Sequence, residues 1–122
     1  MSVRPKIAVH KFSSCDGCQL AFLNLGETLL ELPKLVDIVH LAEAGPMNED
    51  EPVDVALVEG SINTAHDLER IQRIRNNSNY LITIGACATS GGLQALRNMA
   101  DAKAWESAIY ASPEHLDSLD TA

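Results

Sequence analysis

Four short β-prone runs, separated by segments of helical periodicity, are the feature that most restricts the fold of this chain. Each run is rich in apolar residues and has the length of a single strand. We expect strands at residues 6–12, 35–41, 53–58 and 80–84. Strands that alternate with helices form right-handed βαβ units, so the pattern predicts an α/β fold with a parallel sheet between helical layers.

The segments between these runs predict the helices. Apolar positions from Cys18 onward suit one largely buried helix that stops at Pro33. Asn63 or Thr64 can cap a second helix, which the Asn-rich residues 76–79 interrupt. The remaining expectations are a solvated loop at 43–51, helical pieces at 93–98 and 101–110, and an irregular tail at 111–122.

The commonest arrangement for so short a chain is a flavodoxin-like three-layer fold with strand order 2-1-3-4. In this order the carboxyl ends of the first, third and fourth strands lie along one edge of the sheet. Cys15 and Cys18 follow the first strand, Glu59 follows the third and Cys87 follows the fourth. We therefore expect these side chains to converge where open α/β sheets bind their ligands.

Composition excludes several classes of function. The chain has 122 residues, enough for one domain at 1–122, and its 46% hydrophobic fraction supports a packed core. The formal net charge of -8 disfavours nucleic acid and anionic membranes as partners. No apolar run has the length to cross a bilayer, and no signal-peptide core follows the first basic residues, so we expect a cytoplasmic location without membrane insertion.

The three cysteines lie in two glycine-bearing loops. Cys15 and Cys18 stand at the start of a predicted helix, where Gly17 permits the tight turn that lets both sulfurs reach one metal centre. Cys87 lies in the other loop. Thiolates are ligands of iron-sulfur clusters and of zinc, and reducing cytosol disfavours stable disulfides. Metal binding or redox chemistry is therefore the expected use of the thiols.

Residues alone leave several interpretations of these thiols open. A thiol-disulfide oxidoreductase would use Cys15 and Cys18 but leave Cys87 surplus. A zinc-stabilised interaction module needs a fourth ligand, for which His10 is the nearest candidate. An iron-sulfur cluster also needs a fourth ligand, which this chain does not supply as a cysteine. All three thiols are also compatible with simple packing in a core.

Three spaced elements carry a resemblance to a known family: residues 15–18 (CDGC), 59–61 (EGS) and 85–92 (GACATSGG). Together they resemble the small, electron-transferring subunit of nickel-iron hydrogenases, over nearly the whole chain. Residues 51–54 and 94–98 make it most similar to the cytosolic, bidirectional group, including sulfhydrogenase delta subunits. The related 20 kDa subunit of respiratory complex I usually has an adjacent cysteine pair in the first loop. It is the alternative that the separated pair disfavours.

The resemblance implies a 4Fe-4S cluster in this chain. Its metal ligands are expected to be Cys15, Cys18 and Cys87. The residues expected around the cluster are Ser14, Gly17, Glu59, Gly60 and Thr89. The family's fourth ligand sits in a later Gly-Cys-Pro motif that this sequence lacks. We therefore expect residues 1–122 to be the N-terminal part of a longer subunit, with the fifth strand of the sheet absent and the fourth left as an exposed hydrophobic edge.

The implied function is electron relay without a catalytic residue in this chain. Electrons would pass between the nickel-iron centre of a large subunit and further iron-sulfur and diaphorase-type subunits that carry flavin or a nicotinamide cofactor. Ser14 stands where many respiratory relatives have a glutamate linked to proton movement, and a serine does not titrate near neutral pH.

Some of these residues have ordinary alternatives. Glu59 also fits a solvated acid at a strand end, and Thr89 or Ser90 also fits a helix cap. Nothing in the sequence places His40, His66 and His115 together, and we expect them to be ordinary surface or core residues.

Overall fold

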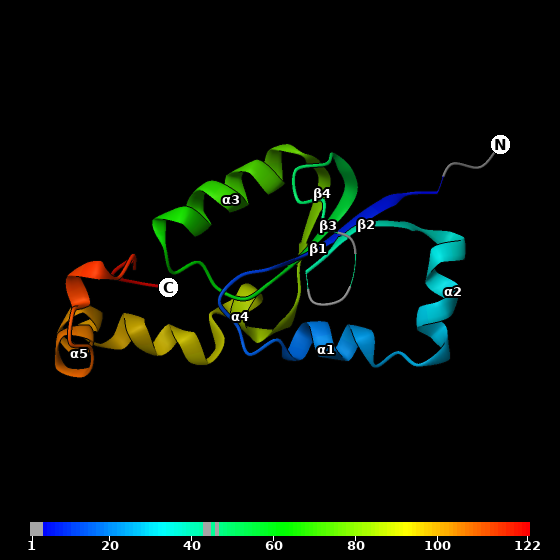
Figure 1. Cartoon of the computed structure of the whole chain (residues 1–122). Coiled ribbons are helices and arrows are strands. Elements are labelled where there is room, and N and C mark those ends of the chain that lie inside the picture. The colour runs from blue at the N-terminus through cyan, green and yellow to red at the C-terminus, as the bar shows by residue number, and fades with distance from the viewer. Residues whose placement is uncertain (1–3, 43–44, 46) are drawn as a thin grey trace.

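A four-stranded parallel sheet forms the centre of the chain, whose computed structural model describes residues 4–42, 45 and 47–122 (Figure 1). The strands are β1 (Lys6–Lys11), β2 (Asp37–Leu41), β3 (Val53–Glu59) and β4 (Ser78–Thr83). Their order is β2-β1-β3-β4, and each neighbouring pair is parallel. The predicted α/β class and the strand order 2-1-3-4 are confirmed.

Helices lie on both faces of this sheet. In Figure 1, α3 (Ala65–Asn76) lies on one face, and α1 (Gly17–Leu23) and α4 (Gly85–Ser90) lie on the other. The remaining helical elements are α2 (Glu27–Leu35), the 3-10 helix η1 (Gly92–Met99), α5 (Ala102–Ile109) and the 3-10 turn η2 (Pro113–His115). None of the helices within the described part of the chain has the length and apolarity needed to span a membrane.

The main core lies between the sheet and α3. Alternate residues of β1 and β3 point to this face, so Ala8, Ala56 and Val58 pack with Ile74 of α3. Removing such side chains from water contributes about 1.5–3 kcal/mol for a residue of valine or isoleucine size. Of the two predicted caps, Asn63 and Thr64, it is Thr64 that caps α3. Its hydroxyl accepts a hydrogen bond from the Asp67 N–H at 3.0 Å.

The prediction of one largely buried helix ending at Pro33 is wrong in three respects. The helix divides into α1 and α2 because Gly26 adopts φ 67° and ψ -132°, a conformation open to glycine and outside any helix. Helix α2 also continues past Pro33 to Leu35. Leucines of both helices are exposed, Leu20 by 50% and Leu30 by 73%. Periodicity could not distinguish a helix buried in its own domain from one that presents leucines outward.

The fourth strand begins at Ser78, two residues before the predicted start at residue 80. Ser78 is buried, and its hydroxyl donates to the Ile74 carbonyl at 2.5 Å, so the chain passes from α3 into β4 within two residues. Among the described strands, β4 has β3 as its one neighbour. Tyr80 and Ile82 are 69% and 47% exposed along it. The described sheet therefore ends in a hydrophobic edge, as predicted.

The expected loop at 43–51 lies partly outside the described residues, since 43, 44 and 46 are not described. Downstream, the tail after α5 is tied back to the body of the chain. Leu119 N donates to the Asn63 carbonyl at 2.6 Å, and Ala122 N donates to Asn98 Oδ1 at 2.9 Å. These bonds hold the end of the described chain near the loop that follows β3 and near η1.

Candidate metal centre

Three loops meet at the carboxyl edge of the sheet. The loop after β1 carries Cys15 and leads into α1. Strand β3 ends at Glu59, and its loop begins at Gly60. Strand β4 leads within one residue into α4, which contains Cys87. Backbone hydrogen bonds join them: Phe12 N donates to the Glu59 carbonyl at 2.9 Å, and Ile84 N donates to the Val58 carbonyl at 2.9 Å. The convergence predicted from the strand order is therefore present in the backbone.

A glycine lies against each of the three sulfur atoms. A Cβ on Gly17 would lie 3.3 Å from Cys15 Sγ, and one on Gly92 would lie 3.2 Å from Cys87 Sγ. A Cβ on Gly85 would overlap Cys18 Sγ. The last contact is between loops, because Gly85 belongs to the helix of Cys87 while Cys18 belongs to α1. Space is thus kept open beside every thiol, and the two cysteine loops touch.

The electrostatic surroundings of Cys18 reflect the same convergence. Burial raises the pKa of the Cys18 thiol, and the nearby Glu59 carboxyl, Cys15 and Cys87 raise it further. Coordination by a metal deprotonates a thiol regardless of such a shift. Cys15 itself is exposed, whereas Cys18 and Cys87 are half-buried.

A single metal ion and an iron-sulfur cluster need different spacings of their ligands. Within the described residues, no three His, Cys, Asp or Glu side chains lie close enough to hold one metal ion. Structural zinc collects four ligands in one shell at about 2.0–2.3 Å, whereas the cysteines of a 4Fe-4S cluster each bind a different iron atom and stand farther apart. Three thiols are soft donors of the kind that iron-sulfur clusters bind. Residues 1–122 contain no fourth cysteine.

Glu59 is 1% exposed, so the alternative of a solvated acid at the strand end is wrong. Within the described structure, neither carboxylate oxygen has a hydrogen-bond partner of good geometry. Burial raises the pKa of Glu59, and Asp16 raises it further, while nearby Ser14 and Cys18 partly offset the shift. Glu59 is therefore a largely desolvated carboxyl next to the thiols.

Gly60 and Ser14 shape the loops around this carboxyl. Gly60 has φ 87°, and a Cβ there would lie 2.7 Å from the Phe12 carbonyl carbon and 2.8 Å from the Ser13 oxygen. Ser14 Oγ accepts a hydrogen bond from Asp16 N at 3.1 Å, in a turn where Asp16 adopts φ 67°. Gly60 lets the loops after β1 and β3 approach closely, and Ser14 stabilises the turn at Asp16.

Thr89 and Ser90 do not cap the following helix, so that alternative is wrong. The Thr89 hydroxyl donates to the Gly85 carbonyl at 2.6 Å, and the Ser90 hydroxyl donates to the Ala86 carbonyl at 3.1 Å. Both bonds run backward within α4. Each hydroxyl proton is thus committed to the backbone of the helix that carries Cys87.

Two histidines that the sequence treated separately are partners. The rings of His10 and His40 stack with their centroids 4.7 Å apart, and both residues are buried. His10 was the candidate fourth zinc ligand, and its ring faces another imidazole instead. Burial lowers the pKa of His10 to about 4, and that of His40 falls for the same reason. The available signal was the strand order, which places β1 beside β2.

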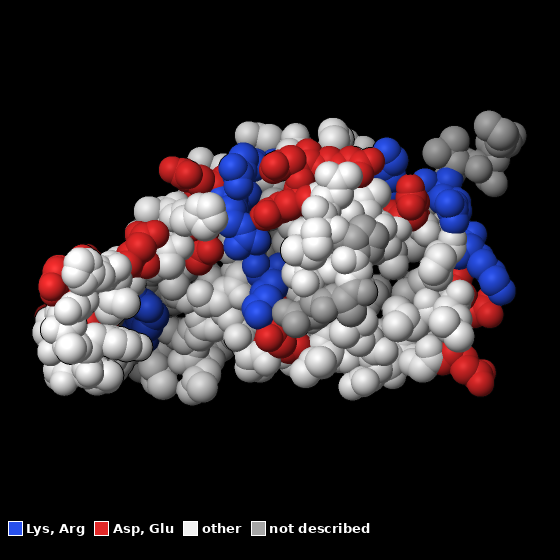
Figure 2. Space-filling model, viewed as in Figure 1, with Lys and Arg blue, Asp and Glu red and all other residues white. Residues whose placement is uncertain are grey.

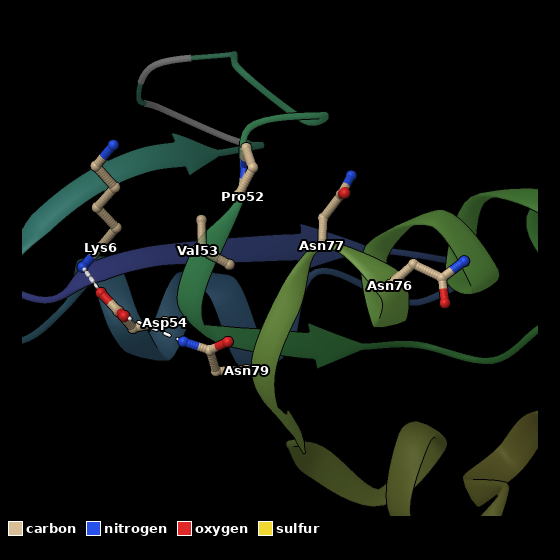
Figure 3. A pocket seen from close by; sticks show the side chains of 7 residues that line it. All are labelled: Lys6, Pro52, Val53, Asp54, Asn76, Asn77 and Asn79. Atoms are coloured by element: carbon tan, nitrogen blue, oxygen red, sulfur yellow. Dashed lines mark hydrogen bonds between the residues drawn. The ribbon is translucent and has the colours of Figure 1, made fainter.

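At the opposite edge of the sheet, described residues line a cavity whose carboxylate is already hydrogen-bonded. The cavity in Figure 3 lies at the amino ends of the strands and is lined by Lys6, Pro52, Val53, Asp54, Asn76, Asn77 and Asn79. Its Asp54 accepts hydrogen bonds from Lys6 N at 2.8 Å and Asn79 Nδ2 at 3.4 Å. The carboxylate there is occupied by the chain's own donors.

Comparison with known proteins decides the family. Residues 15–119 match the family described as NADH ubiquinone oxidoreductase, 20 Kd subunit. The chain belongs to this family. Its relatives include subunit delta of sulfhydrogenase 2 from Pyrococcus furiosus, which is 40% identical over 91 residues, 75% of this chain and 38% of that protein. Subunit delta of the NAD-reducing hydrogenase HoxS from Cupriavidus necator is 33% identical over 98 residues, which cover 80% of this chain and 47% of that protein.

A solved structure agrees with this assignment. The crystal structure of an NAD+-reducing NiFe hydrogenase in the H2-reduced state superposes with a TM-score of 0.81 at 27% identity, covering 98% of this chain and 68% of that chain. The relatives are hydrogenase subunits, which confirms the predicted resemblance. The chain spans about two fifths to one half of the length of these two curated relatives.

Proposed function

We propose that this chain is an electron-transfer subunit of a cytosolic nickel-iron hydrogenase and holds a proximal 4Fe-4S cluster with Cys15, Cys18 and Cys87. The observation that carries the proposal is the contact of Gly85 with Cys18 Sγ, which brings the two cysteine loops together at the carboxyl edge of the sheet. The hydrogenase relatives support the same function. The cluster would accept and donate single electrons, and the protein supplies its position and surroundings.

The chain's own residues hold and shield this site in the proposal. Gly17 and Gly60 let the loops approach, Glu59 contributes a desolvated carboxyl, and Ser14 contributes a hydroxyl that does not titrate near neutral pH. Thr89 stands beside the site with its hydroxyl bonded to the helix backbone. No residue of this chain is assigned a catalytic role.

The partners follow from the same proposal. A large subunit would carry the nickel-iron centre, and further iron-sulfur or diaphorase-type subunits would carry flavin or a nicotinamide cofactor. The fourth cluster ligand would lie outside residues 1–122. A cytoplasmic location, with neither nucleic acid nor membrane as partner, completes the proposal.

The test is metal analysis of the complex purified without oxygen. We expect iron and acid-labile sulfide in equal amounts with this subunit, and nickel with the large subunit. The Cys87→Ser variant is expected to lose most of the iron, while Ser107→Ala, an exposed change on α5, keeps it. Stoichiometric zinc without sulfide would refute the proposal and favour a zinc module. A reversible Cys15–Cys18 disulfide, with activity that survives Cys87→Ser, would favour a thiol-disulfide enzyme.

A second candidate is a subunit of the respiratory complex I type, because the matched family carries that description. The two candidates differ in the partner. A hydrogenase subunit copurifies with nickel and supports hydrogen-dependent dye reduction, whereas a complex I subunit does neither.

A further inference from the structure

Gln94, in η1, links the segment that follows Cys87 to both other loops of the site. Its amide Nε2 donates to the Ser13 carbonyl. Its Oε1 accepts hydrogen bonds from Ser61 Oγ and from Asn63 Nδ2, the latter at 2.5 Å. Asn63 Nδ2 also donates to Ser61 Oγ at 2.8 Å. One side chain thus bonds to the loop after β1 and to the loop after β3.

The chemistry of these partners requires an amide at position 94. The Ser13 carbonyl can only accept, so a donor must face it. Ser61 and Asn63 are 7% and 6% exposed, and their donors need an acceptor because a buried unpaired donor is costly. Glutamine satisfies both sides at once. A leucine satisfies neither, and a carboxylate sets an oxygen against the Ser13 oxygen.

The segment from Ile84 to Gln94, which carries Cys87, is hydrogen-bonded to neighbouring loops at both of its ends. At its first end, the Ile84 N–H is bonded to the Val58 carbonyl at 2.9 Å. At its other end, Gln94 is bonded to Ser13, two positions before Cys15. Ser13 is itself paired with Ser61 by two backbone hydrogen bonds of 3.2 and 2.9 Å. The segment is therefore tied to the loop that leads to Cys15.

We propose that Gln94 is a positioning residue that sets the placement of Cys87 relative to Cys15 and Cys18. This inference rests on the proposed function, in which the three sulfurs must be held at the spacing that one cluster needs. It assigns to Gln94 no contact with the cluster itself. Its effect passes through the Ser13 and Ser61 loops.

The first measurement is independent of any cluster. In the full-length chain freed of iron, amide hydrogen exchange at Ser13 and Ser61 reports how often their paired backbone opens. We expect about fivefold faster exchange in Gln94→Leu and Gln94→Glu, the change that corresponds to losing one ordinary hydrogen bond. Gln72→Leu, an exposed glutamine change on α3, is the matched control and is expected to leave exchange unchanged.

The second measurement uses the complex assembled with its partners and purified anaerobically. For both Gln94 variants we expect less than half of the wild-type iron and sulfide, or a reduced cluster with an altered electron paramagnetic resonance spectrum and midpoint potential. Gln94→Glu provides a rescue: below about pH 6 the introduced carboxyl becomes protonated and can donate to the Ser13 carbonyl. The spectrum of Gln94→Glu is then expected to return toward wild type, while that of Gln94→Leu does not.

The outcomes separate this inference from the proposed function. Normal exchange in both Gln94 variants would overturn the inference. So would faster exchange with unchanged iron content, spectrum and potential, because Gln94 would then stabilise the loops without placing the ligands. If the wild-type complex carries no iron and sulfide, the proposed function fails, and the exchange rates alone decide whether Gln94 holds the cysteine loops together.

Discussion

Substitution of Gly85 by alanine probes the contact on which the candidate site depends. Gly85 has φ 77°, and a Cβ at this position would overlap Cys18 Sγ from the other cysteine loop. Two costs therefore combine in Gly85→Ala. One is the strain of a left-handed backbone with a side chain, and the other is the displacement of a packed sulfur.

The cost of backbone strain and the cost of overpacking can be separated by comparison with a second glycine, Gly26. Gly26 has φ 67° and no atom within 4 Å of its would-be Cβ, so Gly26→Ala is expected to cost only backbone strain, about 1–3 kcal/mol. Gly85→Ala also places a side chain at a positive φ, and is expected to cost backbone strain of that order plus about 1–3 kcal/mol for overpacking against the sulfur. Cys18→Ala should remove that second part, because Cys18 Cβ lies 3.7 Å from the new methyl group, an ordinary contact.

The assay is urea unfolding of the iron-free chain, followed by circular dichroism. The free energies of unfolding of Gly85→Ala, Cys18→Ala and the double variant form a cycle, whose coupling is expected to be about 1–3 kcal/mol in favour of the double variant. A coupling near zero, with Gly85→Ala no worse than Gly26→Ala, would show that the two cysteine loops do not touch. The convergence that supports a shared cluster would then be refuted.

Three other predictions follow from the described contacts. Thr64→Ala removes the oxygen that caps α3 and should lower the free energy of unfolding by about 1 kcal/mol in urea, whereas Thr64→Ser should keep most of it. The pKa of His10 is lowered to about 4 in the fold, against about 6.5 in the unfolded chain, so the unfolded chain binds the proton first as the pH falls. The contribution of His10 to stability should therefore be constant above neutral pH and fall by up to about 3 kcal/mol between pH 6.5 and 4. His10→Phe should reduce this fall in urea titrations at several pH values. Gly60→Ala should destabilise the chain by more than Gly26→Ala, since its Cβ meets rigid backbone of Phe12 and Ser13, and equal urea midpoints for the two variants would contradict this packing.

The sheet was predictable because strand order depends on features that are local or general. Each strand is a short apolar run in the sequence, and the alternation of strands with helices predicted the flavodoxin-like order. The break at Gly26 and the passage of α2 through Pro33 were not predictable in the same way. Gly26 is compatible with a helical pattern in the sequence, and only its backbone conformation shows the break. Proline usually ends a helix, so the pattern gave no sign that α2 continues past the exposed Pro33.

The site was predictable in outline but not in its internal contacts. Parallel strands bring Cys15, Cys18 and Cys87 to one edge, and their convergence there required no knowledge of side-chain packing. The burial of Glu59 and the hydrogen bonds of Gln94 depend on which loops touch. The sequence placed Glu59 near the cysteines but did not decide between a buried and a solvated carboxyl, and it assigned no contact to Gln94. The stacked pair His10 and His40 was missed for the same reason, because the two residues lie on different strands.

The choice among zinc, disulfide exchange and a cluster rests on spacing, because all three chemistries use the same residue types. Strand order places the loops that carry the cysteines at the same edge of the sheet, but it does not bring them into contact. Glycines without side chains then let those loops touch, at Gly60 against Phe12 and at Gly85 against Cys18. The polar bonds of Gln94 limit how far they can separate again. In the proposed function, the placement of the three thiols therefore depends on residues that carry no thiol.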